Sequence, residues 1–443
     1  MSEQALGLTM LLLLVGAILL GYPTAFTLMA LGIIFGYIGF SDIVFRLLVA
    51  STFKVMTNDV LIAIPLFVFM GYLIERAGVL DRLFNSIQLM TGPMRGSLAL
   101  ATMLTCTIFA TATGIVGASV TLMGLLALPA MIKARYDIRL ATGTIAAGGT
   151  LGILIPPSVL LILYGAVAGV SVPRLYAGAF LPGLMLSGLY LIYILVRVYT
   201  DPKAGPALPL EERNFPVLTI IYRAFTSFVP IVGLIGSVLG SILYGWATPG
   251  EAAALGALGA IILAAIYGRL NWVTISESVT LTARTSAMVG WLFVGSSLFA
   301  AVFARLGGSK VIEDWVLSLG LSPITFFWLA QAVIFLLGWP LEWTEITIIF
   351  LPIFLPLLKQ FNIDPLFFGI MTALNQQTSF LSPPVAMSAF YLKGVAPKHV
   401  TLNSIFQGMY PFLGIQVLAM AVLWFWPELA TYLPGMLYGK TSR

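Results

Sequence analysis

Charged residues are scarce in this 443-residue chain, at 9%, whereas hydrophobic residues make up 60%. Soluble domains carry charge on about a quarter of their residues. A chain this long with so few charges cannot cover itself with a hydrated surface, so we expect the lipid bilayer to be its solvent. Uncharged stretches such as 97–132 and 140–173 are apolar on every side. This pattern predicts membrane-spanning helices rather than the alternating strands of a barrel.

Cysteine and histidine each occur once, as Cys106 and His399. No disulfide can therefore form within the chain, and no Cys/His metal cluster or thiol–imidazole pair can be built. His399 follows Lys398 in a polar connection, which is typical of a solvated loop residue. An enzyme embedded in the membrane would need such a constellation or paired acids. Glu342 and Glu345 are the one credible acid pair and no motif surrounds them, so we expect no enzymatic activity.

The basic residues and the N-terminus indicate how the chain enters the membrane. The first apolar run has Glu3 and no basic residue ahead of it, and a second apolar run follows at once, so we interpret it as a transmembrane helix rather than a cleaved signal peptide. The densest basic cluster is Lys133, Arg135 and Arg139. An excess of Lys and Arg marks cytoplasmic loops, so we place this connection in the cytoplasm.

The chain repeats its own pattern. The segment "GILIPPSVLLILYGAVAGVSVP" at 152–173 and the segment "SFLSPPVAMSAFYLKGVAP" at 379–397 each contain a Pro-Pro pair and, at the same offset, a tyrosine. Flanking elements recur in the same order in both halves. We therefore interpret 1–199 as a first repeat and 217–443 as a second, joined by the polar linker 200–216.

Each Pro-Pro pair lies in the middle of a long hydrophobic run, at Pro156–Pro157 and at Pro383–Pro384. Two consecutive prolines remove two N–H donors and disfavour helix before them. Freed backbone groups are costly in lipid, so such a break must lie inside protein or line a wet cavity. Ordinary helix kinks are the alternative. We predict two re-entrant helical hairpins, near 142–172 and 367–396, because matching breaks in two repeats indicate the central site of a transporter.

A helix break offers two kinds of ligand. Free N–H groups at the start of a half-helix suit a carboxylate, and free carbonyl groups suit a cation such as sodium. Small and hydroxylic residues precede the first break, and a polar island, "NQQTS", precedes the second. Hydrogen bonding between helices is the alternative role for such residues. The candidate substrate-binding residues are Thr111, Thr113, Ser158, Asn375, Gln376, Gln377 and Thr378.

Two acids fall between apolar runs. Glu342 and Glu345 are three residues apart and share a helix face. Acids inside a membrane are functional by default. The alternative places both at the membrane–water interface, with Trp339 and Trp343 as belt residues. Three other acids are interpreted as helix-end residues: Asp59, Glu251 and Asp364.

These features together resemble the large membrane subunit of the tripartite ATP-independent periplasmic transporters. The resemblance covers nearly the whole chain, and four segments carry it in the right order: "GGTLGILIPPS" at 148–158, "YAGAFLPG" at 176–183, "LPIFLPLLKQFNIDPLFFGI" at 351–370 and "NQQTSFLSPPVAMSAF" at 375–390. It implies an all-α polytopic membrane protein of the ion-transporter superfamily type, with two inverted-topology repeats, each carrying a re-entrant hairpin, and an elevator mechanism.

The resemblance also implies function and partners. It implies sodium-coupled import of a small organic anion across the inner membrane of a bacterium or archaeon, and keto acids or other monocarboxylates are our expectation for the substrate. The expected partners are a small four-helix membrane subunit, as a separate chain, and a periplasmic substrate-binding protein. The implied sodium ligands, mostly backbone oxygens, are Ala110, Thr113, Gly152, Ile155 and Pro157 at one site and Gly338, Ser379, Ser382 and Val385 at the other.

Two other classes of protein stay open. The first is a stand-alone ion-coupled carboxylate carrier, with the same hairpins and no partners, which a neighbouring gene for a periplasmic binding protein would exclude. The second is the membrane enzyme, for which the chain offers only the Glu342/Glu345 pair.

Overall fold

The computed structural model describes residues 2–209, 215–383 and 385–439, although the side chains of residues 110, 112 and 113 are outside the described set. The elements found there are helical, as expected from the uncharged runs. Seven helices are long and apolar enough to cross a membrane, or up to eight if the bent pair α3–α4 is one span. The described part of the chain is therefore a multi-span helical membrane protein.

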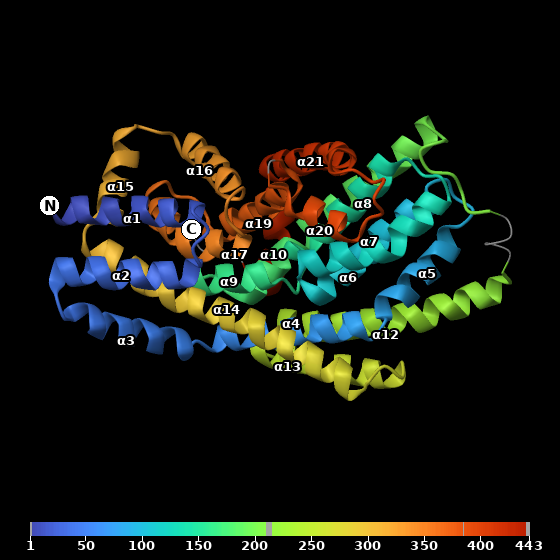
Figure 1. The fold of residues 1–443 in the computed structure, drawn as a ribbon, viewed down its shortest axis with the longest axis horizontal. Coiled ribbons are helices and arrows are strands. Elements are labelled where there is room, and N and C mark those ends of the chain that lie inside the picture. Colours follow the sequence, from blue (N-terminus) through green and yellow to red (C-terminus); the bar gives the residue numbers. More distant parts are fainter. Residues whose placement is uncertain (1, 210–214, 384, 440–443) are drawn as a thin grey trace.

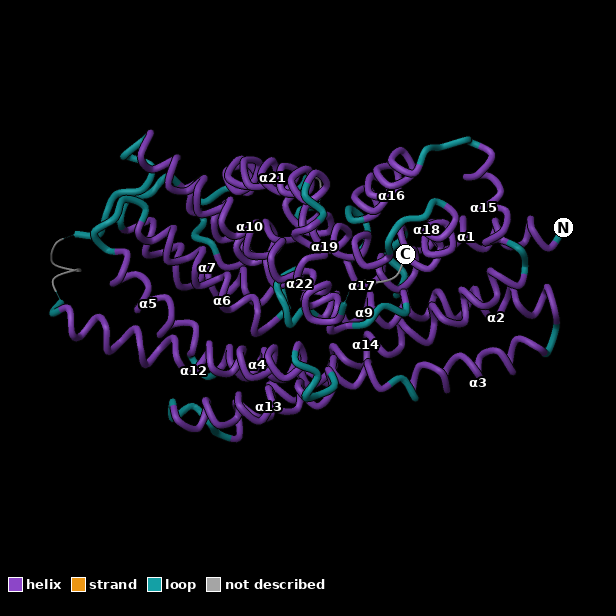
Figure 2. The backbone as a smooth tube through the Cα atoms, turned by 180° about the vertical axis from the view of Figure 1, so that it is seen from behind, coloured by secondary structure: helices purple, strands orange, loops and turns teal. Residues whose placement is uncertain are grey.

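The helices form two layers, which Figure 1 shows one above the other and Figure 2 shows from behind. The lower layer contains α2 (Thr24–Phe40), α3 (Ile43–Met56), α4 (Asp59–Arg76), α12 (Val217–Leu243), α13 (Pro249–Ile266) and α14 (Trp272–Arg305). Helix α14 packs along α2, α3 and α4, and α13 packs along α4. Helix α1 (Glu3–Leu19) lies beside α2.

The upper bundle contains the later helices of each half of the chain, those after α5 and those after α15. Its first part is α6 (Ser97–Thr113), α7 (Val116–Lys133), α8 (Ile138–Thr150), the short 3-10 helix η1 (Leu151–Ile153), α9 (Val159–Ala168) and α10 (Val172–Thr200). Its second part is α16 (Pro323–Leu337), α17 (Trp343–Glu345), the π-helical turn η2 (Ile346–Phe350), α18 (Leu351–Gln360), α19 (Pro365–Leu381), α20 (Met387–Val395), α21 (Leu402–Phe425) and α22 (Glu428–Tyr438).

Two short helices connect the layers. Helix α5 (Val79–Thr91) leads from α4 to α6, and α15 (Gly308–Ser318) leads from α14 to α16. Each begins after a glycine in the left-handed region, Gly78 with φ +68° and Gly307 with φ +79°. Other residues adopt this conformation at a steric cost, so glycine allows the sharp change of direction at both junctions.

Helix starts follow the local sequence. Thr248 and Glu251 form a capping box at the start of α13, and Asp364 accepts a hydrogen bond from the Leu366 N–H at the start of α19. Both acids are helix-end residues, as predicted. Inside the bundle, α8 and α21 approach backbone to backbone, because a Cβ added to Gly143 would lie 2.1 Å from the Gly408 carbonyl oxygen. Small residues permit such close packing in membranes.

The pair α6–α7 folds back on itself. The backbone N–H of Leu98, at the start of α6, donates to the Tyr136 hydroxyl, just past the end of α7, at 3.1 Å. The reversal occurs at Gly114, where φ is +62°. We call residues 110–116 tip 1.

The segment α16–α18 also folds back, from the other end of the molecule. The Phe326 ring near the start of α16 stacks on the Phe361 ring after α18, with centroids 4.3 Å apart. The chain reverses around Gly338 and continues into α17. We call residues 338–345 tip 2.

The Pro-Pro segments interrupt helices that continue across the bundle, and this corrects the positions expected for the hairpins. Helices α8 and α9 lie on opposite sides of the first break in Figure 1, and the Tyr164 hydroxyl on α9 donates to the Pro365 carbonyl at the start of α19 at 2.5 Å. Helix α19 starts at Pro365, beside α9. Beyond the second break, α20 runs along α7: a Cβ added to Gly124 on α7 would lie 2.8 Å from the side chains of Leu392 and Val395 on α20. Consecutive prolines remove hydrogen-bond donors, but they do not make the chain reverse its direction. The segments 142–172 and 367–396 are therefore broken helices, and the segments that fold back, α6–α7 and α16–α18, come before them in the chain.

Candidate functional site

Tip 1 packs against the first break. A Cβ added to Gly114 would lie 3.5 Å from Val159 Cγ2 and 3.8 Å from the Pro157 carbonyl oxygen. Gly152, Ile155 and Pro157, predicted at one sodium site, are buried in this break. Ser158 is also buried, and its hydroxyl donates to the Ile153 carbonyl. The folding of α6–α7 therefore brings two parts of the predicted site together.

Tip 2 packs against the second break in the same way. A Cβ added to Gly338 would lie 1.9 Å from Ser379 Oγ, so only glycine fits there. The Trp339 indole N–H donates to the Ser382 hydroxyl at 3.1 Å. Val385 follows in the break and is half-buried. Gly338, Ser379 and Ser382, predicted together at the other sodium site, are thus in one place.

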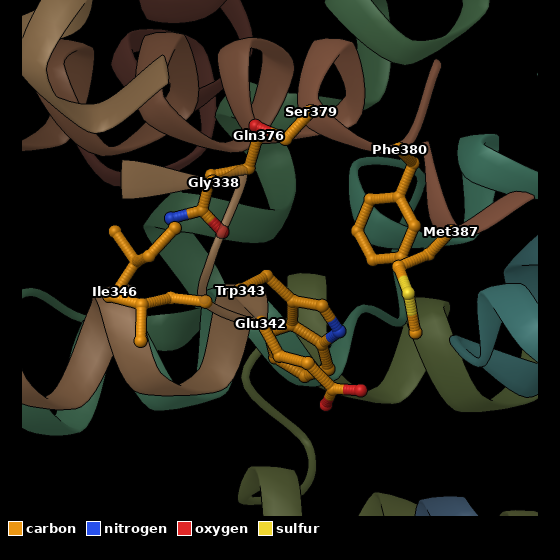
Figure 3. Close-up of a pocket in the computed structure, with 9 residues that line it drawn as sticks. Gly338, Glu342, Trp343, Ile346, Gln376, Ser379, Phe380 and Met387 are labelled. Carbon is orange, nitrogen blue, oxygen red and sulfur yellow. The ribbon is translucent and has the colours of Figure 1, made fainter. Parts of the chain in front are cut away.

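A narrow pocket lies between tip 2 and the second broken helix. Figure 3 shows the Gln376 amide and Ser379 on the α19 side, Glu342 and Trp343 on tip 2, and Phe380 and Met387 at the far wall. Its lining residues are Gly338, Leu341, Glu342, Trp343, Ile346, Gln376, Ser379, Phe380 and Met387. No lysine or arginine lines this pocket, so an anion bound there would be held by backbone groups, by neutral side chains or by a cation that binds with it.

Backbone donors are available at the breaks. Helices α7, α9 and α20 begin at or beside them, and none has a side chain capping its first turn. Ala386, the residue before α20, has φ +30°, in the left-handed region. Uncapped helix N-termini present N–H groups and a positive dipole end, which together suit a carboxylate.

The polar island on α19 divides between two roles. Asn375 Nδ2 donates to the Gln331 side chain at 2.9 Å and to its backbone carbonyl at 2.7 Å, on α16. The Thr378 hydroxyl donates to the Asn375 carbonyl at 2.5 Å. Asn375 therefore joins α19 to α16, which is the alternative that the sequence left open, whereas Thr378 bonds within α19. Gln376 faces the pocket, and Gln377 contacts Thr150 on α8 at 3.3 Å.

The two acids on tip 2 differ in their surroundings. The Glu342 carboxylate lies on the pocket rim (Figure 3), whereas the Glu345 carboxylate accepts a hydrogen bond from the Thr24 hydroxyl on α2. Glu345 also accepts from the Glu342 backbone N–H at 3.2 Å. Glu345 thus links tip 2 to the lower layer, and Glu342 alone faces the pocket.

The remaining predicted residues lie on or near tip 1 and the second break. Thr111 is buried, and its hydroxyl donates to the Ile108 carbonyl within α6 at 2.5 Å. The side chains of Ala110 and Thr113, and the whole of Pro384, lie outside the described residues.

Sequence reasoning missed the residues that complete the site. Gln331 is 44 positions before its partner Asn375, and Phe380 and Met387 look like ordinary apolar residues. The signal that could have located tip 2 is "GWP" at 338–340, in which a glycine and a proline interrupt an apolar run between two charged ends.

Known proteins similar in sequence to this chain show its family. The family model described as "Tripartite ATP-independent periplasmic transporter, DctM component" matches residues 11–429. A C4-dicarboxylate TRAP transporter large permease protein of Pseudomonas aeruginosa is 31% identical over 88% of this chain and 90% of its own. The sialic acid TRAP transporter large permease protein of Vibrio cholerae is 27% identical over 86% and 88%.

A solved structure shares the fold. The YdaH transporter of Alcanivorax borkumensis aligns with a TM-score of 0.62 and 16% identity, over 97% of this chain and 98% of that one. The family match extends over both folded-back pairs and both broken helices. The chain therefore belongs to the tripartite ATP-independent periplasmic (TRAP) transporter family, as its DctM component, the large permease subunit.

Proposed function

We propose that this subunit carries a small organic anion into the cell across the inner membrane, driven by a sodium gradient. The observation that carries the proposal is the arrangement of the centre, where two tips from opposite ends of the molecule each pack against the break of a following helix. Such breaks gather free N–H and carbonyl groups at mid-membrane depth without a charged side chain. The subunit works with a small membrane subunit and a periplasmic binding protein.

Sodium fits the chemistry of both predicted sodium sites, one at each break. Oxygen ligands without a full charge suit this ion, and the Ser379 hydroxyl is buried with no hydrogen-bond partner among the described residues. We propose one ion at Ala110, Thr113, Gly152, Ile155 and Pro157, and one at Gly338, Ser379, Ser382 and Val385. A bound ion would bring positive charge next to a pocket that has no basic side chain.

For the pocket we propose an anion with a single carboxylate. Relatives of this chain are named for C4-dicarboxylate, sialic acid and isethionate, all of them anionic. Uncapped helix starts and the Gln376 and Ser379 side chains supply neutral donors. Neutral donors compensate one negative charge more readily than two, and the Glu342 carboxylate on the rim opposes further negative charge. Monocarboxylates are the class we propose.

The movement we propose is that of an elevator between two inverted repeats. Broken helices α8–α9 and α19–α20 run in opposite directions through the upper bundle, and the two tips enter from opposite ends. This arrangement supports repeats at 1–199 and 217–443 joined by the linker 200–216. The upper bundle would carry the substrate past the lower layer, and α5 and α15 would be its flexible connections.

Uptake into reconstituted vesicles tests this function. Vesicles that contain both membrane subunits, supplied with the binding protein and a labelled monocarboxylate that the binding protein retains, should accumulate label only with an inward sodium gradient. Replacing sodium by potassium should reduce uptake at least about tenfold, and undiminished uptake would refute sodium coupling. Equal uptake without the binding protein and the small subunit would instead support the stand-alone carrier.

A further inference from the structure

Four polar side chains from four helices meet where α19 packs against α8 and α21. They are Thr150 on α8, Tyr190 on α10, Gln377 on α19 and Gln416 on α21, and each is fully buried. The Tyr190 hydroxyl lies near the Gln416 amide and the Thr150 hydroxyl, but outside the geometry of a direct hydrogen bond to either. The Thr150 hydroxyl in turn lies 3.3 Å from Gln377 Oε1. We call this group the four-helix polar compartment.

Few of the polar atoms in this compartment are paired by direct hydrogen bonds. The Thr150 hydroxyl has one hydrogen and donates it mainly to the Ala147 carbonyl at 2.8 Å, which leaves the longer contact with Gln377 weak. Within the described part of the chain, Tyr190 Oη, Gln377 Nε2 and both polar atoms of the Gln416 amide have no hydrogen-bond partner. Buried polar atoms in folded proteins are paired in the great majority of cases, with protein or with ordered water.

Apolar packing closes the compartment from lipid. The Phe412 ring is fully buried and stands edge-on to Tyr190, with ring centroids 5.2 Å apart, and edge-on to Tyr193, at 5.0 Å. The close approach of α8 and α21 at Gly143 and Gly408 closes the same side. A ligand of this compartment must therefore be small, and it stays enclosed in the upper bundle.

The chemistry of the unpaired atoms selects the ligand. A cation needs acceptors only and an anion needs donors only, but the compartment offers both kinds. Amide nitrogens are donors only, an amide oxygen is an acceptor only, and the Tyr190 hydroxyl is either. Exchanging the assigned O and N of a glutamine does not alter this, because each amide keeps one of each. Water is the small molecule that both donates and accepts.

We propose that the four-helix polar compartment binds ordered water that bridges the two broken helices. Thr150 ends α8 just before the first break, and Gln377 lies one turn before the end of α19, just ahead of the second. Water bound between them joins the two broken helices through hydrogen bonds that can rearrange. The compartment is separate from the pocket, because neighbouring residues on α19 serve the two: Gln376 lines the pocket and Gln377 faces α8.

A high-resolution electron-microscopy map of the complete membrane complex in lipid tests the site directly. The expected result is at least one density peak about 2.7–3.2 Å from two or more of the Tyr190, Gln377 and Gln416 polar atoms. A peak with short contacts to oxygens alone would indicate a cation and overturn the proposal. A direct Tyr190–Gln416 bond with no peak, or a dry compartment, would overturn it as well.

Coupling between substitutions gives a second test. If one water bridges both groups, Tyr190→Phe should lower the melting temperature of the wild-type complex but change it little in the Gln416→Leu background. The control is Tyr193→Phe, on the same helix and against the same Phe412 ring, whose effect should be equal in both backgrounds. Additive effects of Tyr190→Phe and Gln416→Leu would show that no shared water exists. Repeating the melts in potassium should leave the coupling unchanged, since sodium takes no part in it.

Discussion

The Glu345 carboxylate joins two parts of the molecule that are 321 residues apart in the chain, because it accepts a hydrogen bond from Thr24 on α2. The same carboxylate accepts from the Glu342 backbone N–H. It therefore holds the first turn of tip 2 and fixes that tip against the lower layer. Both partners are only partly buried, which limits the stabilisation that this hydrogen bond contributes.

Replacing Thr24 by Val removes the hydroxyl and keeps the shape of the side chain. A hydrogen bond to a charged group contributes about 1.5–3 kcal/mol, so we expect Thr24→Val to destabilise the protein toward the lower end of this range. The measurement is the melting temperature of the purified complex, which should fall by a few degrees. Thr27→Val is the control, because the Thr27 hydroxyl is exposed and bonds only the Pro23 carbonyl in its own helix. Equal melting temperatures for both variants would show that the contact with Glu345 contributes nothing.

The sequence indicates which residue types gather at the site, but it does not say which face each one occupies. Asn375, Gln376 and Gln377 are consecutive, so they point in different directions around α19. Their partners Gln331, Thr347 and Thr150 come from three other helices. Those contacts depend on how distant segments pack, and no local pattern in "NQQTS" encodes them. The alternative of helix–helix bonding accordingly applies to some members of the island and not to others.

The elements of the site show a similar division between what the sequence encodes and what packing decides. Two Pro-Pro pairs correctly predicted breaks in two long apolar runs. They did not predict which segments fold back, because a proline removes a donor wherever the chain goes next. The reversals depend on Gly114, which supplies a left-handed conformation, and on Gly338, which supplies space.

The fit at Gly338 can be tested by adding one carbon atom. Its φ is −67°, which alanine adopts without strain, so the effect of Gly338→Ala comes from contact alone. The new Cβ would lie 1.9 Å from Ser379 Oγ and 2.5 Å from Ser379 Cβ. Overpacking of this kind costs about 1–3 kcal/mol, and here it forces tip 2 away from α19. We expect uptake to fall at least about tenfold, with the protein still present in the membrane.

Two further variants make this result specific. Adding Ser379→Gly to the Gly338→Ala chain removes both clashing atoms and should restore the melting temperature. The double variant still lacks the Ser379 hydroxyl that we propose as a sodium ligand. Gly236→Ala is the control, since Gly236 lies inside α12 with nothing within 4 Å of the added Cβ. That change should stabilise the helix by about 0.5–1 kcal/mol and leave uptake unaltered. Normal uptake by Gly338→Ala would contradict the proposed fit between tip 2 and α19.

At the scale of the whole molecule, composition alone predicted a helical membrane protein, and the internal repeat predicted that the two halves share an element order. The layers could not be predicted in the same way, because apolar helices are equally suited to lipid and to one another. Their pairing depends on close approaches such as Gly143 to Gly408 and on single polar contacts such as Thr24 to Glu345. Few side-chain hydrogen bonds join the two layers in the part of the chain that the structure describes, among them Thr24–Glu345 and Tyr438–Leu243, and this supports the sliding movement that we propose.

Movement of the upper bundle can be tested by joining it to the lower layer. In a chain with Cys106→Ala, the pair Thr24→Cys and Glu345→Cys places one thiol on α2 and one on tip 2. Bridging them with a bifunctional maleimide should abolish uptake, because the elevator step that we propose requires the two to separate. The control pair is Arg76→Cys and Glu277→Cys, which replaces an ion pair between α4 and α14 within the lower layer. That cross-link should leave uptake within about twofold of the reduced protein, because these helices stay together. With bridging measured by intact mass, undiminished uptake by the Thr24–Glu345 cross-linked protein would show that substrate crosses without separation of the layers.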